Sequence, residues 1–291
     1  MQSNNIFQSY QSLGNDLYNC NNCTDCFVRK NSDTAKYCQI GENNKFIYDS
    51  NFADDCELQY EGTNLQKNYY MWFGALVWYC DYSFYLTFSF HSQNCFLCTG
   101  LKHQQYCIFN KQYTKEDYEL TVSKILTHMQ STGERWEFFH PSLSPFGYNE
   151  TVAQEYFPLT KSEALARWYK RSDYNPDPVI PTWVETLQGD QIPNDISLVW
   201  DDILTKILIC EVSKRPFKIQ KSELEFYRTH HLPLPRKHPD IRHEERMRLR
   251  PWRTMFLRTC DKCDKEILSV YDRDYSWKVY CEKCYQKEVY S

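Results

Sequence analysis

The sequence predicts a mixed, mainly β protein, with a Cys- and Tyr-rich β domain, then short helices and a linker, then tandem ribbon-like modules. Three observations lead to this prediction. Runs rich in Tyr, Phe and Ile alternate with Asn, Asp, Ser and Gly turns over residues 1–112. Helix-capping patterns begin only at Thr114. Cysteine pairs with the spacing of zinc knuckles lie within residues 260–284.

Residues 1–112 carry a recurring pattern in which Tyr, Asn or Asp precedes Cys. The cysteines of this pattern are Cys20, Cys38, Cys56, Cys80, Cys95 and Cys107, and the steps between them are 18, 18, 24, 15 and 12 residues. Such recurrence is typical of repeat architectures, and a β-solenoid, in which like residues stack on successive coils, is one interpretation. Because the period drifts, a plain antiparallel β domain is the alternative.

The compartment affects how the 14 cysteines are interpreted. The chain starts MQSNNIFQSY, without the basic start and apolar run of a secretory signal, so we expect a cytoplasmic protein. In a reducing compartment, cysteines are metal ligands or buried small hydrophobes more often than disulfides. Cys20, Cys23 and Cys26 follow one another at three-residue steps, and Cys95 and Cys98 repeat this spacing. A metal or redox site and a buried ladder both fit the spacing.

One apolar run, residues 69–90, is long enough to span a bilayer. It contains Asp81 and five tyrosines, and no cluster of Lys or Arg flanks it. We therefore predict buried, aromatic-rich strands here, and no membrane partner.

Residues 113–200 are predicted to hold helical segments and a Pro-rich linker. A capping box at Thr114 precedes an apolar helical face that runs to residue 130, and Gly133 follows it. A second capping box, at Thr160, begins a helix expected to reach about Lys170. The segment 174–200 contains four prolines without a long period, which predicts an extended linker.

The strongest motif is a pair of Cys-x-x-Cys knuckles separated by 17 residues, formed by Cys260, Cys263, Cys281 and Cys284. Two knuckles supply four thiolates in a tetrahedron, which suits zinc, although iron could occupy the same site. Four protein ligands leave no open position for water, so we expect a structural zinc rather than a catalytic one. Between the knuckles we predict a hairpin, with strands at 267–271 and 277–280.

The preceding module begins with a short helix at 201–206 and an apolar strand at 207–210. It continues as Cys210-Glu-Val-Ser213, Phe217-Lys-Ile219, Glu223-Leu-Glu-Phe226-Tyr227 and Leu232-Pro-Leu-Pro-Arg236-Lys-His238-Pro-Asp-Ile241-Arg242. This run resembles a family of uncharacterised bacterial Cys-rich proteins with tandem C-terminal zinc-ribbon domains. Residues 106–113 and 144–159 also resemble that group.

The resemblance implies zinc ligands at the positions of Cys210, Ser213, His238 and Ile241, of which only Cys210 and His238 can bind zinc. His243, two residues beyond the expected position, could supply a third ligand. These three residues are weak candidates for a second metal site. The alternative is that the module keeps its shape through an ordinary core made of Phe217, Ile219, Leu224, Phe226 and Tyr227.

Residues 214–258 form a basic stripe with thirteen Lys or Arg residues against five acidic ones, a net charge of +8 in a chain of net charge −4. The candidate nucleic-acid contacts are Arg242, Arg246, Arg248, Arg250, Trp252 and Arg253. On one continuous helix, residues 242, 246, 250 and 253 would share a face. Arginine forks suit phosphates, and a tryptophan can stack on a base, so RNA or DNA is one possible partner. A solvated helix face and an acidic protein partner are the alternatives.

No phosphate-binding loop, nucleophile elbow or HExxH helix is present, so the sequence does not settle whether the protein is an enzyme. A His-dependent hydrolase built on His238 and His243 is the weakest hypothesis. The working prediction is a zinc-stabilised nucleic-acid-binding protein, and a structural or assembly protein is the main alternative. The predicted domains are the β domain at 1–112, the helical and linker region at 113–200, the degenerate ribbon at 201–258 and the zinc ribbon at 259–291.

Overall fold

The computed structural model describes residues 1–174, 177 and 179–290, and it is mainly β, as predicted. The chain divides into two compact units. One comprises Met1–Pro145 together with Trp252–Ser291, and the other comprises Phe146–Pro251. Pro176 and Pro178 of the predicted linker lie outside the described residues.

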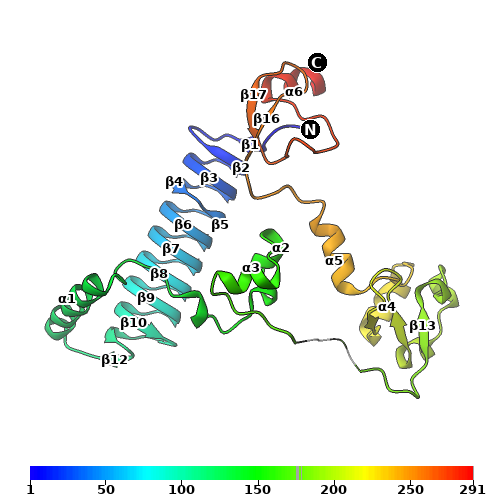
Figure 1. Ribbon diagram of the computed structural model, residues 1–291, viewed down its shortest axis with the longest axis horizontal. Coiled ribbons are helices and arrows are strands. Elements are labelled where there is room, and N and C mark those ends of the chain that lie inside the picture. The colour runs from blue at the N-terminus through cyan, green and yellow to red at the C-terminus, as the bar shows by residue number, and fades with distance from the viewer. Residues whose placement is uncertain (175–176, 178, 291) are drawn as a thin grey trace. The chain divides into compact units, whose positions relative to one another are not determined.

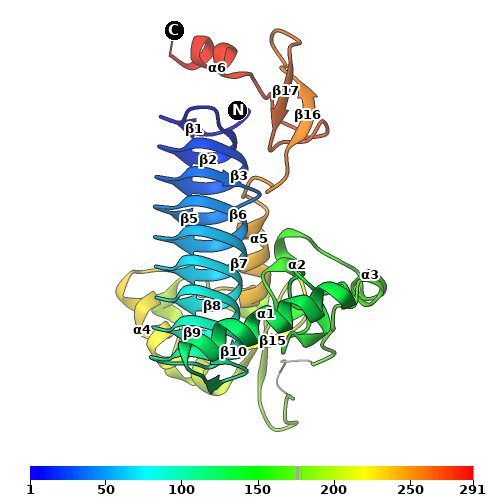
Figure 2. The same ribbon diagram turned by 90° about the vertical axis from the view of Figure 1, so that its left-hand side faces the viewer.

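The first unit contains a β-solenoid (Figures 1 and 2). Its strands are β1 Ile6–Phe7, β2 Leu13–Tyr18, β3 Asn21–Lys30, β4 Asp33–Lys36, β5 Gln39–Glu42, β6 Lys45–Asp54, β7 Glu57–Gln66, β8 Tyr69–Trp78, β9 Asp81–Phe90, β10 Gln93–Thr99, β11 Gln105–Ile108 and β12 Lys111–Gln112. Neighbouring strands pair in parallel, except for the final antiparallel β11–β12 pair. The register pairs Lys45 with Glu57, Glu57 with Tyr69 and Tyr69 with Asp81, so each coil holds twelve residues. This confirms the solenoid interpretation.

Each coil turns four corners, because every third residue adopts a left-handed backbone conformation. From Asn43 to Leu97 these corner residues have φ between 45° and 58°, and none of them is glycine. The residue after each corner points inward, so every third side chain from Asn44 to Leu101 is buried. The apolar run 69–90 forms β8 and β9 of this structure, as predicted. Within the described residues, no helix is long and apolar enough to cross a membrane.

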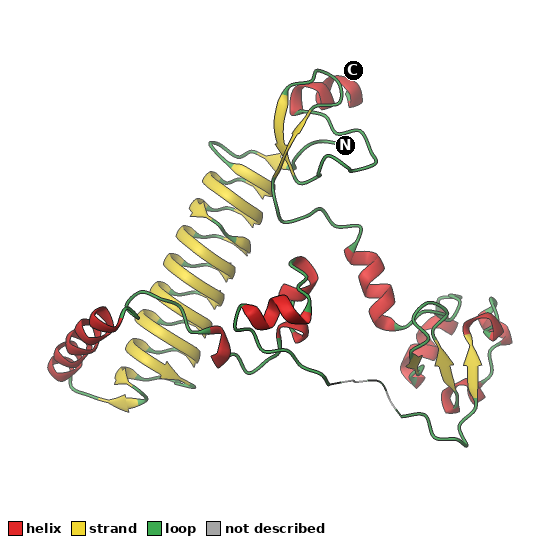
Figure 3. Cartoon of the chain, viewed as in Figure 1, coloured by secondary structure: helices red, strands yellow, loops and turns green. Residues whose placement is uncertain are grey.

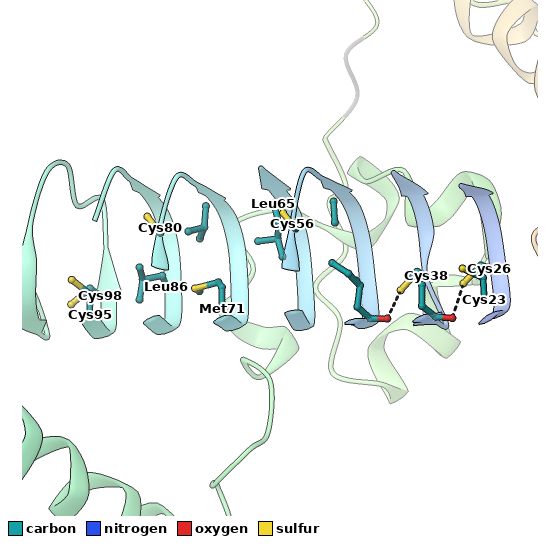
Figure 4. Close-up of a cluster of buried hydrophobic side chains, with 14 of the residues drawn as sticks. Cys23, Cys26, Cys38, Cys56, Leu65, Met71, Cys80, Leu86, Cys95 and Cys98 are labelled. Atoms are coloured by element: carbon teal, nitrogen blue, oxygen red, sulfur yellow. Dashed lines mark hydrogen bonds between the residues drawn. The ribbon is translucent and has the colours of Figure 1, made fainter. Parts of the chain in front are cut away.

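Small polar side chains suit the inward positions because they bond to the backbone of neighbouring coils. Cys26 Sγ lies 3.4 Å from the carbonyl oxygens of both Thr24 and Ala35. Asn68 donates to the Val77 carbonyl at 2.7 Å and accepts from the Cys80 amide at 2.8 Å. All nine cysteines between residues 20 and 107 are buried and free, and Figure 4 shows Cys26, Cys56 and Cys80 among those in this interior. The buried-ladder interpretation of these cysteines is therefore confirmed.

Helix α1, Lys115–Thr132, packs on one side of the later coils (Figure 1). Thr114 caps its start, and Gly133, at φ 78°, ends it, as predicted. Tyr118 and Met129 of this helix join outward-facing aromatic residues of the coils in a second core, which also receives Trp136.

The C-terminal part of the first unit holds β16 Phe256–Thr259, β17 Glu266–Ser269 and α6 Glu282–Val289 (Figure 3). The predicted hairpin between 267–271 and 277–280 is wrong, because β17 pairs antiparallel with the preceding strand β16 instead. Residues 277–280 lie beside the N-terminal segment, where the Ser3 amide donates to the Tyr280 carbonyl at 3.0 Å. Ser269 Oγ donates to the Ser3 carbonyl at 2.9 Å, so the start of the chain is held between both parts of the ribbon.

The second unit contains short elements around its own core. They are η2 Tyr148–Glu150, α2 Ala153–Tyr156, α3 Lys161–Ala166, β13 Thr186–Gln188, η3 Gly189–Gln191, η4 Ile196–Leu198, η5 Asp201–Thr205, β14 Ile207–Ile209, β15 Pro216–Phe217, α4 Lys221–Thr229 and α5 Pro239–Met247; the remaining short helix, η1 Pro141–Leu143, belongs to the first unit. The capping box at Thr160 is present, but its helix ends at Ala166 rather than near Lys170.

Two sequence predictions about this unit need correction. The segment 174–200 is not an extended linker throughout, because β13 pairs with β14, and Ile192 and Ile196 are buried in the core. That core also holds Phe217, Ile219 and Leu224, as predicted, with Tyr227 packed against it. Phe226 is 54 % exposed on the outer face of α4, and its ring lies at 51° to the His230 ring, with the centroids 4.5 Å apart.

Candidate metal centre and basic surface

The four predicted ligands Cys260, Cys263, Cys281 and Cys284 come together at one point. Their Sγ atoms all lie within 4.8 Å of one another, and this is the only such group of three or more possible ligands in the described part of the chain. The Sγ atoms of Cys263 and Cys281 are 3.8 Å apart. Sulfurs around a tetrahedral ion with metal–sulfur bonds of about 2.3 Å would be about 3.8 Å apart. The group therefore fits a metal ion.

Local backbone structure positions each half of the centre. After β16, the Cys260 amide donates to the Lys265 carbonyl at 2.8 Å, and Asp264, at φ 53°, closes the knuckle in a left-handed conformation. Cys281 is the N-cap of α6, which places Cys284 in the first turn of that helix. The positive end of a helix dipole favours thiolates in this position.

The electrostatics of the knuckle favour a thiolate at Cys260. Burial raises the pKa of this thiol, but hydrogen bonds from the amides of Cys281, Lys262 and Cys263 outweigh burial and lower the pKa to about 6. The Cys281 amide lies 3.2 Å from the Cys260 sulfur. A thiol that ionises readily is suited to binding a metal ion.

Sequence reasoning missed the residues that support the centre. Arg258 is buried at 6 % exposure, and its guanidinium contacts the Asp261 carboxylate at 2.9 Å. The same carboxylate accepts the Val279 amide at 2.6 Å, which ties the first knuckle to the segment that carries Cys281. The one signal in the sequence is the acidic residue inside the first knuckle, Asp261, with the basic residue Arg258 three positions earlier.

The preceding module repeats this backbone arrangement with different side chains. The Cys210 amide donates to the Arg215 carbonyl at 3.0 Å, and Lys214, at φ 59°, closes the turn as Asp264 does. His238 is the N-cap of α5, and its backbone amide donates to the Cys210 sulfur, as the Cys281 amide does to Cys260. The module thus has a ribbon backbone in which Ser213 and Ile241 occupy two of the four ligand positions.

The three weak candidates for a second metal site do not converge. His238 uses Nδ1 to accept the Asp240 amide at 3.1 Å. His243 Nε2 contacts the Glu155 carboxylate at 2.9 Å. Cys210 receives the Ser213 amide at 3.4 Å. Each of the three therefore has a partner of its own, and the two histidines lie beside different carboxylates, His238 beside Asp240 and His243 beside Glu155.

The basic stripe is interrupted, which corrects the expected continuous face. Helix α5 ends at Met247, and Pro251, which has no amide to donate, prevents a helix from continuing to Arg253. Arg242 bonds to the Tyr227 hydroxyl, Arg250 contacts the Tyr156 hydroxyl, and Arg253 donates to the Gln39 side chain at 3.0 Å.

Three of the predicted contacts stay exposed. Arg246 is exposed on α5, the Arg248 side chain is 77 % exposed and lies 4.0 Å from Glu244, and Trp252 is 52 % exposed. These residues retain the chemistry expected of a phosphate or base contact.

The fold and the four-cysteine centre define a β-solenoid protein with a C-terminal ribbon whose cysteines could hold a metal ion. The chain matches no protein-family model, and the search of curated proteins gives no match.

Proposed function

We propose that the four-cysteine centre holds zinc and that the zinc is structural. Four thiolates in a tetrahedron suit this ion, and the 3.8 Å separation of Cys263 and Cys281 supports the assignment. All four positions around the ion would be filled by protein, which favours a role in folding. Elemental analysis of the purified protein tests the proposal, and one equivalent of iron in place of zinc would overturn it.

We propose further that the protein is a structural or assembly protein that binds a partner protein through its solenoid. The supporting observation is a surface of aromatic residues on β6 to β9, which we call the aromatic surface; it comprises Phe46, Tyr48, Tyr60, Tyr69, Tyr70, Trp72 and Tyr82. Phe46 is 37 % exposed and Tyr82 50 % exposed. Exposed aromatic clusters of this kind are enriched at protein interfaces.

Site-specific photo-crosslinking tests this function. A benzoylphenylalanine at Phe46 should give a discrete crosslinked product in cells, and the partner identified from it should bind the purified protein. The matched control is the same substitution at Phe226, which is 54 % exposed in the other unit and should give no such product. Equal binding of the purified partner to a Phe46→Ser/Tyr82→Ser variant would contradict the proposal.

Nucleic-acid binding is the second candidate, and the exposure of Arg246, Arg248 and Trp252 favours it. If phosphate contacts form, affinity for short RNA or DNA should fall steeply with salt. An Arg246→Glu/Arg248→Glu variant should then lose binding, whereas Lys115→Glu/Lys124→Glu, two exposed cations on α1, should retain it. Absence of binding at low salt would overturn this candidate.

A further inference from the structure

The aromatic surface contains a cavity of about 460 Å³ that spans several coils of the solenoid. Its walls include Tyr48 of β6, Tyr60 of β7, and Tyr70, Trp72 and Phe73 of β8, and Trp136 closes it from the segment after α1. Nearly all of the lining is apolar or aromatic. These residues belong to a single compact unit, so the cavity is a feature of the solenoid itself.

The rings of the cavity meet at steep angles. Trp72 and Trp136 lie 5.4 Å apart with their planes at 75°, and Tyr60 and Phe73 lie 5.6 Å apart at 84°. A cation in such a cage faces the electron-rich surface of more than one ring, which is how proteins bind organic cations. An anionic ligand would be repelled by the same ring faces.

Carboxylates stand beside this cage. Asp49 and Glu61 occupy the same corner of neighbouring coils, each directly after a lining tyrosine, and Glu61 bonds to the Tyr60 hydroxyl. Glu137 follows Trp136 and acts electrostatically on Tyr60 and Glu61. Within the described residues, none of the three carboxylates has a basic group within 4.0 Å; Lys36 acts on Asp49 from farther away. The aromatic cage is therefore flanked by net negative charge, of which Lys36 offsets a part at Asp49.

The neighbourhood already holds one guanidinium on the same tryptophan. Arg135 lies over the Trp136 ring, 4.9 Å from its centroid, and lines the adjoining cavity rather than this one. Arg135 thus occupies a separate space, and the cavity described here has aromatic walls without a cation.

We propose that this cavity binds the arginine side chain of a partner protein. Arginine matches it better than lysine, because its planar guanidinium stacks on aromatic rings and its fork can meet carboxylate oxygens. The apolar walls cover the aliphatic part of the side chain. The proposal rests on the proposed assembly function, because it names the chemistry of the partner group that enters the aromatic surface.

A titration with N-acetyl-arginine amide tests the proposal directly, without the partner. In the NMR spectrum, the indole NH signals of Trp72 and Trp136 should shift. The two signals are assigned through Trp72→Phe and Trp136→Phe variants. N-acetyl-citrulline amide, which has nearly the same shape but no charge, should leave them in place. Equal shifts with both compounds, or none with arginine, would overturn the proposal.

The carboxylates provide the matched variants. Asp49→Asn and Glu61→Gln should each weaken arginine binding roughly three- to tenfold. Asp25 occupies the same corner two coils before Asp49, so Asp25→Asn should leave arginine binding unchanged. Unchanged affinity in both cavity variants would contradict the assignment. If the partner crosslinks at Phe46 but arginine does not bind, the arginine site is wrong and the assembly function stands. If arginine binds but no partner crosslinks, the arginine site stands and the assembly function is contradicted.

Discussion

Arg29 occupies space that Gly41 leaves open on the next coil: a Cβ atom on Gly41 would lie 2.5 Å from Arg29 Nη1. Arg29 is 1 % exposed, in an inward row that also holds Leu17, Leu65 and Ser89. Its Nη1 donates to the Ile40 carbonyl at 3.4 Å, but its Nε and Nη2 make no hydrogen bond. A buried cation with so few partners costs stability.

Replacing this arginine with an apolar residue of similar length should stabilise the protein. We expect Arg29→Met to raise the free energy of unfolding by about 1–3 kcal/mol, because unpaired buried polar groups are removed. Urea unfolding measures the change, and Lys30→Met, on the exposed neighbour, is the control. A loss of stability would mean that Arg29 has an anionic partner. The thiols of Cys38 and Cys23 are the candidates, because hydrogen bonds from neighbouring cysteines and the Arg29 charge lower the pKa of both.

A second prediction concerns the strain at the corner residues. Val28 has φ 57° and is 43 % exposed, and a β-branched residue is strained in this conformation. Val28→Asn should stabilise the solenoid by about 1 kcal/mol, since asparagine tolerates the left-handed region. The thermal midpoint measures the effect.

The same change at an extended position is the control for the corner effect. Lys45→Asn should give no gain, because Lys45 is exposed and has an ordinary backbone conformation. Equal changes at both sites would argue against corner strain.

The two ribbon modules provide a matched test of the metal centre. Cys263→Ser should abolish stoichiometric metal binding and loosen residues 252–290, because the ion supplies energy that so small a core lacks. Cys210→Ser, at the position in the other module that corresponds to Cys260, should leave the metal content unchanged. Elemental analysis and limited proteolysis report the two results. Retention of one full equivalent in Cys263→Ser would show that the four thiolates are not the site.

Carboxyl groups at the cavity should make stability depend on pH. Burial raises the pKa of Asp49 above 3.8 and of Glu61 above 4.5, so the folded protein holds protons that the unfolded chain has released. The stability that these two carboxyl groups contribute is therefore present at low pH, and it is lost as pH rises through their raised pKa values. An Asp49→Asn/Glu61→Gln variant should flatten this loss, which urea unfolding at a series of pH values above 3.8 would measure.

Glu163 should behave in the opposite way. Hydrogen bonds from the Thr160 hydroxyl and amide lower the pKa of Glu163, so its contribution is present above 4.5 and is lost as pH falls. Glu163→Gln should remove that loss at acid pH. The two variants together separate the cavity carboxyls from an ordinary helix cap, and parallel changes in both would contradict this assignment.

The sequence was informative where one residue type has one structural meaning. The paired knuckles identified the metal ligands, and Thr114 with Gly133 marked both ends of α1. The twelve-residue coil was harder to see, because the inward positions accept Cys, Ser, Asn, Gly or Leu almost equally. The cysteine steps of 18, 24, 15 and 12 share only a factor of three, which is the spacing of inward residues.

Other features depended on contacts between distant segments. Residues 277–280 favour a strand, but their partner is the segment around Ser3 rather than β17. The predicted continuous arginine face is wrong because Pro251 ends the helical region before Arg253. The cavity joins Tyr48 to Trp136, which no local pattern could bring together.

The bond between Ser3 and Ser269 joins residues 266 positions apart in the chain. On the ribosome, the first coil emerges long before the ribbon that receives this segment. Until the ribbon is made, the N-terminal segment of the nascent solenoid has no partner on that side and can pair with other chains. If the four thiolates bind an ion as proposed, shortage of that ion should delay this contact and lead to misassembly of newly made protein.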